Sequence, residues 1–361
     1  MLLSRLITVL FFLCAALSLK AAVAVDVLEA WQGFSSPDIL SSGFTHSYYS
    51  LPQEGSTDYN GPRFWSADYW PSKVGGINHR WYSSRPAGFR TNSPKRNEVL
   101  RMNSNQLAAL APSEKYDILM GRYDYPLKKQ VAASVSETAQ DWEGICHGWV
   151  VAALHHSEPT PKYLTNSDGV VVPFGSSDIK ALITYYYAID QGNAPTVGRR
   201  CNFGQWTGGE TDCDQDLNAG AFHIIIANRI GLARQGLIMD VERLDQVWNQ
   251  PVIAYSSKVT AEFTPGRDAA RGTVREFRLT TQVWYVNETE NNWERVQGTA
   301  LQKFDTKVLQ YRIELNRNDE IIGGTWESKE RPDFIWHKEK AQRFDGYFFR
   351  LSTLLNDDSF E

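Results

Sequence analysis

The residue best suited to covalent chemistry is Cys146, in the segment Gln140-Asp-Trp-Glu-Gly-Ile-Cys-His-Gly-Trp149. An apolar run follows the thiol, and its spacing predicts a core helix over residues 142–156. A thiol at a helix start is suited to nucleophilic attack, because the first-turn N–H groups and the helix dipole stabilise the thiolate. Gln140 and Trp149 are expected to support the site, Gln140 as an amide beside an oxyanion. The alternative is that Cys146 is a small buried hydrophobic residue.

A cysteine nucleophile needs a base and a group that orients that base. His223 is the preferred base, because residues 221–227 form a β-branched run typical of a buried strand. Asp240 ends the next strand-like run, so adjacent strands would place its carboxylate beside the imidazole. The order Cys, His, Asp along the chain is the papain-like one. Asp245 and Asn249 lie close behind Asp240 as alternatives.

The other histidines are weaker candidates for the base. His147 follows Cys146 directly, but successive helical side chains point about 100° apart. His155 and His156 lie more than two turns further along the predicted helix. A lone strand histidine is also often a satisfied core residue, and this alternative stays open for His223.

Two sequence patterns resemble metal sites, and both are incomplete. Carboxylates and an amide alternate at Asp212, Asp214, Asp216 and Asn218, as in a Ca²⁺ loop, without the glycine and final glutamate of an EF-hand. Cys201, Cys213 and His223 lack a fourth zinc ligand and a Cys-x-x-Cys pair. We expect a solvated loop and no metal ligands. No cofactor is predicted with certainty, and Ca²⁺ stays open.

The composition is that of a globular protein of 361 residues, 42% hydrophobic and 22% charged, with 12 tryptophans. The formal net charge is −5, and no Lys/Arg stripe runs along the chain. Nucleic-acid binding is therefore not expected. The tryptophans indicate a large core or aromatic-walled clefts.

The first 24 residues are typical of a secretory signal, with a basic Arg5, an apolar run from Leu6 to Leu19 and small residues before the cut. The apolar run is too short for a comfortable membrane span, so we expect an exported protein with no membrane span in the mature chain. Cys14 leaves with the signal. In an oxidising compartment the economical pairing is a Cys201–Cys213 disulfide, which leaves Cys146 free.

The elements that must position these residues divide the mature chain into three parts. Residues 25–112 are rich in Ser, Gly, Pro and aromatics, and predict a wrap packed on another part or a removable pro-segment. Residues 113–255 hold the predicted catalytic core, including a helix over 176–190. Residues 256–361 predict antiparallel β structure, with strands over 276–286 and 309–315.

Several blocks of the sequence resemble the transglutaminase elicitor family of oomycetes, which has bacterial relatives. Val247-Trp-Asn-Gln-Pro-Val252 resembles the start of a surface peptide by which plants detect the oomycete enzymes, and Ile253-Ala-Tyr255 departs from its remainder. Further blocks surround Tyr69, Cys146 and His223, and others lie at Ile321–Trp326 and Pro332–Trp336. Together they extend over residues 65–336.

The resemblance implies an α+β fold with a papain-like core, in which a central helix packs on an antiparallel sheet. It implies Cys146 as nucleophile, His223 as base and Asp240 as the orienting acid. The expected reaction is transfer of a protein glutamine to a lysine or a small amine through a Cys146 thioester. A protease or glutamine deamidase with the same triad is one alternative, and a non-enzymatic surface or adhesion protein is another.

Overall fold

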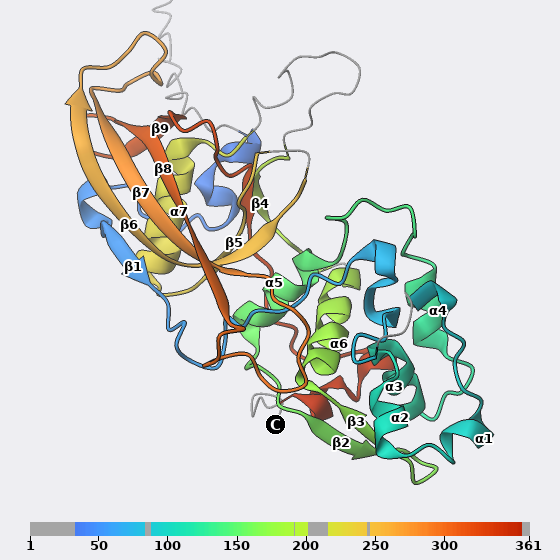
Figure 1. Ribbon diagram of the computed structural model, residues 1–361. Coiled ribbons are helices and arrows are strands. Elements are labelled where there is room, and N and C mark those ends of the chain that lie inside the picture. The colour runs from blue at the N-terminus through green and yellow to red at the C-terminus, as the bar shows by residue number, and fades with distance from the viewer. Residues whose placement is uncertain (1–32, 84–87, 191, 201–215, 244–245, 356–361) are drawn as a thin grey trace, which may run out of the picture.

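The chain folds into two lobes, one built on an antiparallel sheet and one built from helices (Figure 1). This computed structural model describes residues 33–83, 88–190, 192–200, 216–243 and 246–355. In the view of Figure 1 the sheet lobe is at the upper left, the helical lobe at the lower right, and α5 lies between them. The predicted α+β class with an antiparallel sheet is confirmed.

The large sheet runs in the order β4-β10-β5-β6-β7-β8-β9, with β1 added at β6, and its pairings are antiparallel. Asp240 lies on β5, Asn249 lies on β6, and Glu288 follows β7 directly. The predicted strands over 236–240, 276–286 and 309–315 are confirmed, and strands from the predicted core share this sheet with those of the C-terminal region. The bounds are β1 (Glu54–Ser56), β4 (Thr196–Gly198), β5 (Leu237–Asp240), β6 (Asn249–Phe263), β7 (Arg275–Asn287), β8 (Lys303–Leu315), β9 (Ile321–Trp326) and β10 (Phe334–Trp336).

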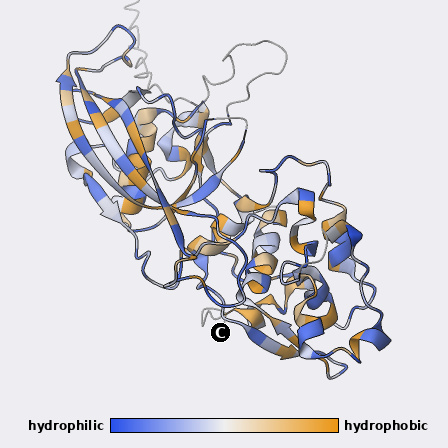
Figure 2. Ribbon diagram, in the orientation of Figure 1, coloured by the Kyte–Doolittle hydropathy of each residue, from blue (hydrophilic) through white to orange (hydrophobic). Residues whose placement is uncertain are grey.

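Helix α7 (Ala219–Ile226) packs against the sheet and replaces the strand predicted over 221–227, so that prediction is wrong. Asn218 starts the helix, because its side chain accepts a hydrogen bond from the Gly220 N–H at 2.8 Å. Every residue of α7 is buried, and Figure 2 shows the helix as mostly hydrophobic. A helix buried on all sides loses its amphipathic period, so its β-branched run cannot be told from a buried strand by pattern.

The helical lobe is centred on α5 (Cys146–His155) and α6 (Ser176–Ile189), which pack closely together. Gly148 makes this approach possible, because a Cβ at that position would collide with the Thr184 carbonyl. The predicted helix over 142–156 begins only at Cys146. The lobe is completed by α1 (Arg96–Val99), α2 (Ser104–Ala108), α3 (Pro112–Leu119), α4 (Pro126–Ala132) and the hairpin of β2 (Lys162–Thr165) and β3 (Val171–Phe174).

The aromatic segment before α1 packs on the helical lobe. Trp65 and Trp70 are almost fully buried, and the Trp65 indole donates to the His156 carbonyl at 3.0 Å. The Ile145 N–H donates to the Tyr69 carbonyl at 2.8 Å, which ties this segment to the residue before Cys146. The segment therefore forms part of the surroundings of the thiol.

The connection between β7 and β8 is fastened to the same lobe by buried polar contacts. Glu158 accepts hydrogen bonds from the Val296 and Gln297 N–H groups at 2.7 and 2.9 Å, and forms a buried ion pair with Lys180. The Thr289 N–H donates to the Ala67 carbonyl at 3.0 Å. The end of β7 thus lies beside the aromatic segment.

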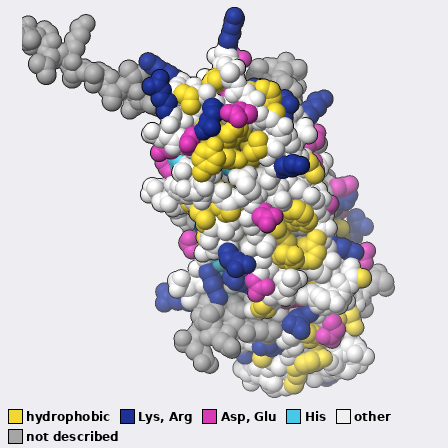
Figure 3. All heavy atoms as spheres, turned by 90° about the vertical axis from the view of Figure 1, so that its left-hand side faces the viewer, with side chains coloured by type: hydrophobic (Ala, Val, Ile, Leu, Met, Phe, Trp, Pro, Cys, Tyr) yellow, Lys and Arg dark blue, Asp and Glu magenta, His cyan; other side chains and the backbone are white. Residues whose placement is uncertain are grey.

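On the face of the molecule shown in Figure 3, acidic and basic side chains are intermingled, without a continuous basic area.

Candidate functional site

Cys146 begins α5, and its side chain faces the start of β6. The residue is 6% exposed. The thiol donates to the Val247 carbonyl at 3.8 Å, and the Asn249 amide Nδ2 donates to the sulfur at 3.9 Å. The Trp336 indole Nε1 donates to Asn249 Oδ1 at 2.7 Å, which fixes the amide with its nitrogen toward the sulfur. The helix start, β6 and β10 together therefore hold the thiol.

Burial raises the pKa of the Cys146 thiol to about 11. Hydrogen bonds from the Asn249 backbone and side chain act in the opposite direction, and the carboxylates of Glu288 and Asp240 add to the increase. The N-cap residue Ile145 makes no side-chain hydrogen bond to the first turn of α5. The Gly148 N–H of that turn donates to the Ile145 carbonyl at 3.0 Å, so within the described residues the N–H groups of Cys146 and His147 are the ones available to a negative charge. In the resting site the sulfur is a protonated thiol at neutral pH.

Asp240 is brought to this site, as the last residue of β5 and the register partner of Asn249 on β6. Its Oδ1 accepts the Trp248 N–H at 2.9 Å, whereas its buried Oδ2 has no hydrogen-bond partner. Burial raises the pKa of this carboxyl from 3.8 to about 8, with Asp333 adding to the increase and the Trp248 N–H opposing it. Asp240 therefore changes protonation close to neutral pH.

His223, the expected base, is not brought to Cys146. It lies in the middle of α7, fully buried, with Nδ1 hydrogen-bonded to the Tyr311 hydroxyl at 2.8 Å. Burial lowers the pKa of this imidazole to about 4. No hydrogen bond or charge interaction joins it to Cys146 or Asp240 in the part of the chain that the structure describes. The expected pair of adjacent strands is absent because residues 219–226 are helical.

The two residues expected to support the thiol, Gln140 and Trp149, make other contacts. Gln140 is exposed, and its Oε1 accepts the Trp142 indole N–H at 3.0 Å, without a contact to Cys146. Trp149 is fully buried and donates to the Trp65 carbonyl at 3.1 Å, so it belongs to the core and not to a cleft wall. Trp248 follows Val247, whose carbonyl accepts from the thiol, and its ring lies edge-on to the Tyr69 ring with 5.5 Å between the ring centroids.

A cleft of about 520 Å³ lies next to this aromatic pair, and sequence reasoning did not identify it. Tyr69 and Glu288, which both line it, interact by charge with Cys146. Its lining consists of Asp68, Tyr69, His79, Trp81, Glu288, Thr289, Glu290 and Asn291. Nothing in the sequence indicates that residues 68–81 and 288–291 meet, because they are far apart along the chain.

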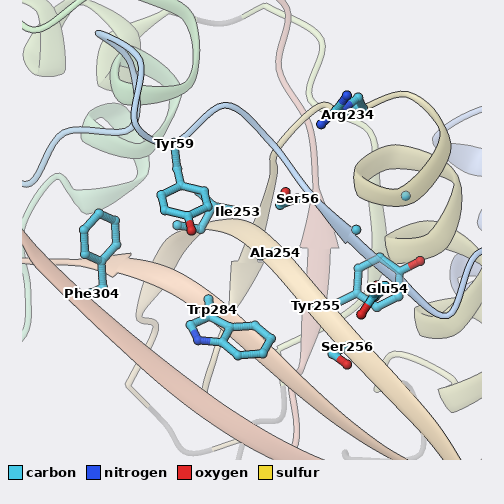
Figure 4. A pocket seen from close by; sticks show the side chains of 12 residues that line it. Glu54, Ser56, Tyr59, Arg234, Ile253, Ala254, Tyr255, Ser256, Trp284 and Phe304 are labelled. Atoms are coloured by element: carbon cyan, nitrogen blue, oxygen red, sulfur yellow. The ribbon is translucent and has the colours of Figure 1, made fainter.

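A larger hollow of about 810 Å³ lies where β1 meets β6 (Figure 4). Rings of Tyr59, Trp284 and Phe304 stand on one side of it, and Glu54 and Arg234 lie toward the other end. Its lining contains no cysteine or histidine.

Several expected features lie outside the described residues. These are the signal segment, the Cys201–Cys213 disulfide, Asp212, Asp214 and Asp245. Within the described ranges, no group of three or more His, Cys, Asp or Glu side chains is arranged to hold a metal ion. Asp216, from the carboxylate-rich loop, is paired with Arg331 at 2.6 Å. No helix in those ranges has the length and apolar character needed to cross a membrane.

Comparison with protein families decides the relationship of the chain. The family model described as "Transglutaminase elicitor" matches residues 128–345, more than half of the chain. The chain belongs to the transglutaminase elicitor family. The predicted resemblance is thereby confirmed, and the matched range includes Cys146, Asp240 and Asn249.

A solved structure agrees with this family membership. The crystal structure of the GP42 transglutaminase from Phytophthora sojae is similar with a TM-score of 0.64 and 20% identity, over 88% of this chain and 94% of that one. At this identity the likeness shows the fold alone. No protein among the curated ones matches the chain. Family and fold together support a transglutaminase-type function for this member of the elicitor family.

Proposed function

We propose that the protein is a protein-glutamine γ-glutamyltransferase with Cys146 as its nucleophile. The observation that carries the proposal is a buried thiol at the uncapped start of α5, fixed by Asn249 and beside Asp240, in a chain of the transglutaminase elicitor family. The substrates are a protein glutamine and a primary amine, supplied by lysine or a small amine.

In the first half-reaction, the Cys146 sulfur attacks the carboxamide carbon of the glutamine. The oxygen that becomes negative is stabilised by the first-turn N–H groups of α5, with the Asn249 amide beside them. The C–N bond breaks, ammonia leaves, and a γ-glutamyl thioester forms on Cys146.

Asp240 is the proposed proton carrier of this reaction. Its ionised form, which becomes the major form only above pH 8 because the pKa is raised to about 8, takes the thiol proton and then gives it to the departing ammonia. A group whose pKa is near the working pH is suited to both steps, and the pKa of Asp240 is raised to about 8. The contacts of His223 do not support the base role expected from the sequence, and its proposed role is to hold α7 against Tyr311.

In the second half-reaction, an amine attacks the thioester carbon and the C–S bond breaks. The amine loses one proton to Asp240, and the Cys146 thiol is restored. Cys146 is 6% exposed, and this burial limits the access of water, which favours the amine as acceptor. A helix-borne cysteine facing an antiparallel sheet also fits the papain-like arrangement, and residues 1–24 favour export of the protein.

The test is incorporation of a fluorescent amine into a glutamine-rich protein, with ammonia release measured in parallel. Wild-type protein is expected to perform both, and Cys146→Ala to perform neither, with or without a chelator. Ammonia release without amine incorporation would indicate a deamidase. Peptide cleavage without ammonia, or full activity of Cys146→Ala, would refute the proposal.

A further inference from the structure

The cleft beside Tyr69 contains two half-buried carboxyl groups, Asp68 and Glu288, that lack a cationic partner in the described residues. Asp68 Oδ1 accepts the Trp70 N–H at 3.1 Å, and Asp68 Oδ2 accepts the Asn291 Nδ2 group at 2.7 Å. Glu288 accepts from the Gln250 Nε2 group at 2.8 Å. All of these donors are neutral amides, and no Lys, Arg or His in the described ranges pairs with either carboxyl. Burial raises the pKa of both.

Two amide oxygens on the side chains bonded to these carboxyls are also without donors in the described residues. Gln250 is 2% exposed, and its Oε1 has no hydrogen-bond partner although its nitrogen is bonded to Glu288. The buried Oδ1 of Asn291, which lines the cleft, is unpartnered as well. A buried acceptor without a donor is costly, so these oxygens favour a water molecule or a ligand that supplies donors.

The cleft meets the proposed nucleophile through Tyr69. This ring interacts by charge with Asp68, Glu288 and Cys146, and its backbone carbonyl accepts the N–H of the residue before Cys146. Glu288 interacts by charge with Cys146 directly. The cleft therefore lies close enough to the thiol for its carboxylates to act on the charge of the sulfur.

We infer that this cleft, with Asp68 and Glu288 at its base, is the acyl-acceptor site and takes the primary ammonium group of a lysine side chain or alkylamine. An ammonium group supplies three donors and one positive charge, which matches two carboxyls and two free amide oxygens. Tyr69 and Trp81 line the same cleft and suit the methylene stem and the cation. A volume of about 520 Å³ accommodates such a side chain. This inference rests on the proposed transferase function.

The chemistry of the second half-reaction follows from this placement. The bound ammonium gives one proton to the Glu288 carboxylate and becomes a neutral amine. Its nitrogen attacks the thioester carbon, the C–S bond breaks, and its second proton returns through Asp240 to the Cys146 sulfur. Glu288 then loses its proton to solvent. Asp68 holds the cation while Glu288 takes the proton.

The experiment measures how the Cys146 thioester partitions between aminolysis by the acceptor and hydrolysis by water. With a glutamine peptide as donor and cadaverine as acceptor, mass spectrometry gives the ratio of amide product to hydrolysed glutamate product. Asp68→Asn and Glu288→Gln are each expected to lower this ratio about tenfold, the effect of one lost charge-assisted hydrogen bond. Glu294→Gln is the matched control, because Glu294 lies exposed in the same connection and outside the cleft.

A neutral nucleophile separates the cation site from general damage. The ratio measured with hydroxylamine, which is uncharged at neutral pH, is expected to stay at the wild-type value in all three variants. Loss of folded protein lowers both products together and leaves the ratio unchanged. An unchanged cadaverine ratio in both cleft variants overturns the inference alone. Absence of any Cys146-dependent product from the wild type refutes the proposed function.

Discussion

Replacing Asp240 with asparagine is expected to stabilise the protein while abolishing its activity. Asp240 is fully buried (0% exposed), and its Oδ2 has no hydrogen-bond partner in the described residues. In the unfolded chain the carboxyl ionises freely, whereas in the folded site burial opposes its charge. Asparagine has nearly the same shape, keeps an acceptor for the Trp248 N–H, and carries no charge.

The magnitude follows from the pKa of this carboxyl, which rises from 3.8 in the unfolded chain to about 8 in the fold. Because the folded pKa is the higher one, its contribution to stability is fully present below pH 3.8 and is lost as the pH rises through 8. Linkage gives a loss of about 2 kcal/mol at pH 5 and about 5 kcal/mol at pH 8. The asparagine variant has no such loss.

The assay is urea unfolding of wild type and Asp240→Asn at both pH values. The stability difference between the two proteins is expected to increase by about 3 kcal/mol from pH 5 to pH 8 in favour of the variant. Asp305→Asn, which alters an exposed carboxylate on β8, is the control and should follow the wild type. If the free energies of unfolding of wild type and Asp240→Asn change equally with pH, Asp240 is not an unpaired buried acid, and its proposed role as proton carrier is refuted.

Four further predictions concern the same neighbourhood. His223→Gln is expected to lower the free energy of unfolding by about 1–3 kcal/mol, because the hydrogen bond to Tyr311 is lost. The rate of Cys146 alkylation by iodoacetamide is expected to stay unchanged. A decrease of that rate by orders of magnitude would show that the imidazole acts as the base. The pKa of His223 is lowered from 6.5 to about 4 in the folded protein, so its contribution to stability is present above pH 6.5 and is lost as the pH falls through 4. In urea unfolding, wild type should therefore lose about 3 kcal/mol of unfolding free energy in acid that the variant does not lose. Asn249→Ala should slow alkylation at pH 8 about tenfold, because both the amide donor and its fixed geometry are lost; equal rates would contradict the contact. Glu288→Gln should raise the alkylation rate about threefold, since a repelling charge is removed, and a slower rate would contradict that repulsion.

Local patterns allowed part of the site to be predicted from the sequence. Cys146 precedes an apolar run, and a helix start is a local property set by the residues that follow. The strand ending at Asp240 is short, apolar up to its last residue and preceded by a turn glycine, so its position could also be predicted. Asn249 lay among the alternatives to Asp240, and an antiparallel register makes these two residues neighbours.

The remaining parts depend on packing that no local pattern records. His223 lies in a helix buried on all sides, where the hydrophobic period disappears and strand and helix become indistinguishable. Tyr69 reaches the site only through the bond from Ile145 to its carbonyl, and Glu288 only through the docking of the β7–β8 connection. Such long-range pairings are determined by the assembled lobes.

The charges around Cys146 have opposite effects on the two half-reactions proposed for it. Burial disfavours a thiolate, and Glu288 and Asp240 add to this effect, so the resting site keeps a protonated sulfur. Attack requires the proton to pass to Asp240 as the carboxamide binds. Once the thioester has formed, the sulfur carries no charge and the repulsion ends. The same carboxyls then attract only the cationic acceptor. An acidic site that slows the first step therefore favours capture by an amine over water in the second, which is the selectivity that a transferase needs and a hydrolase does not.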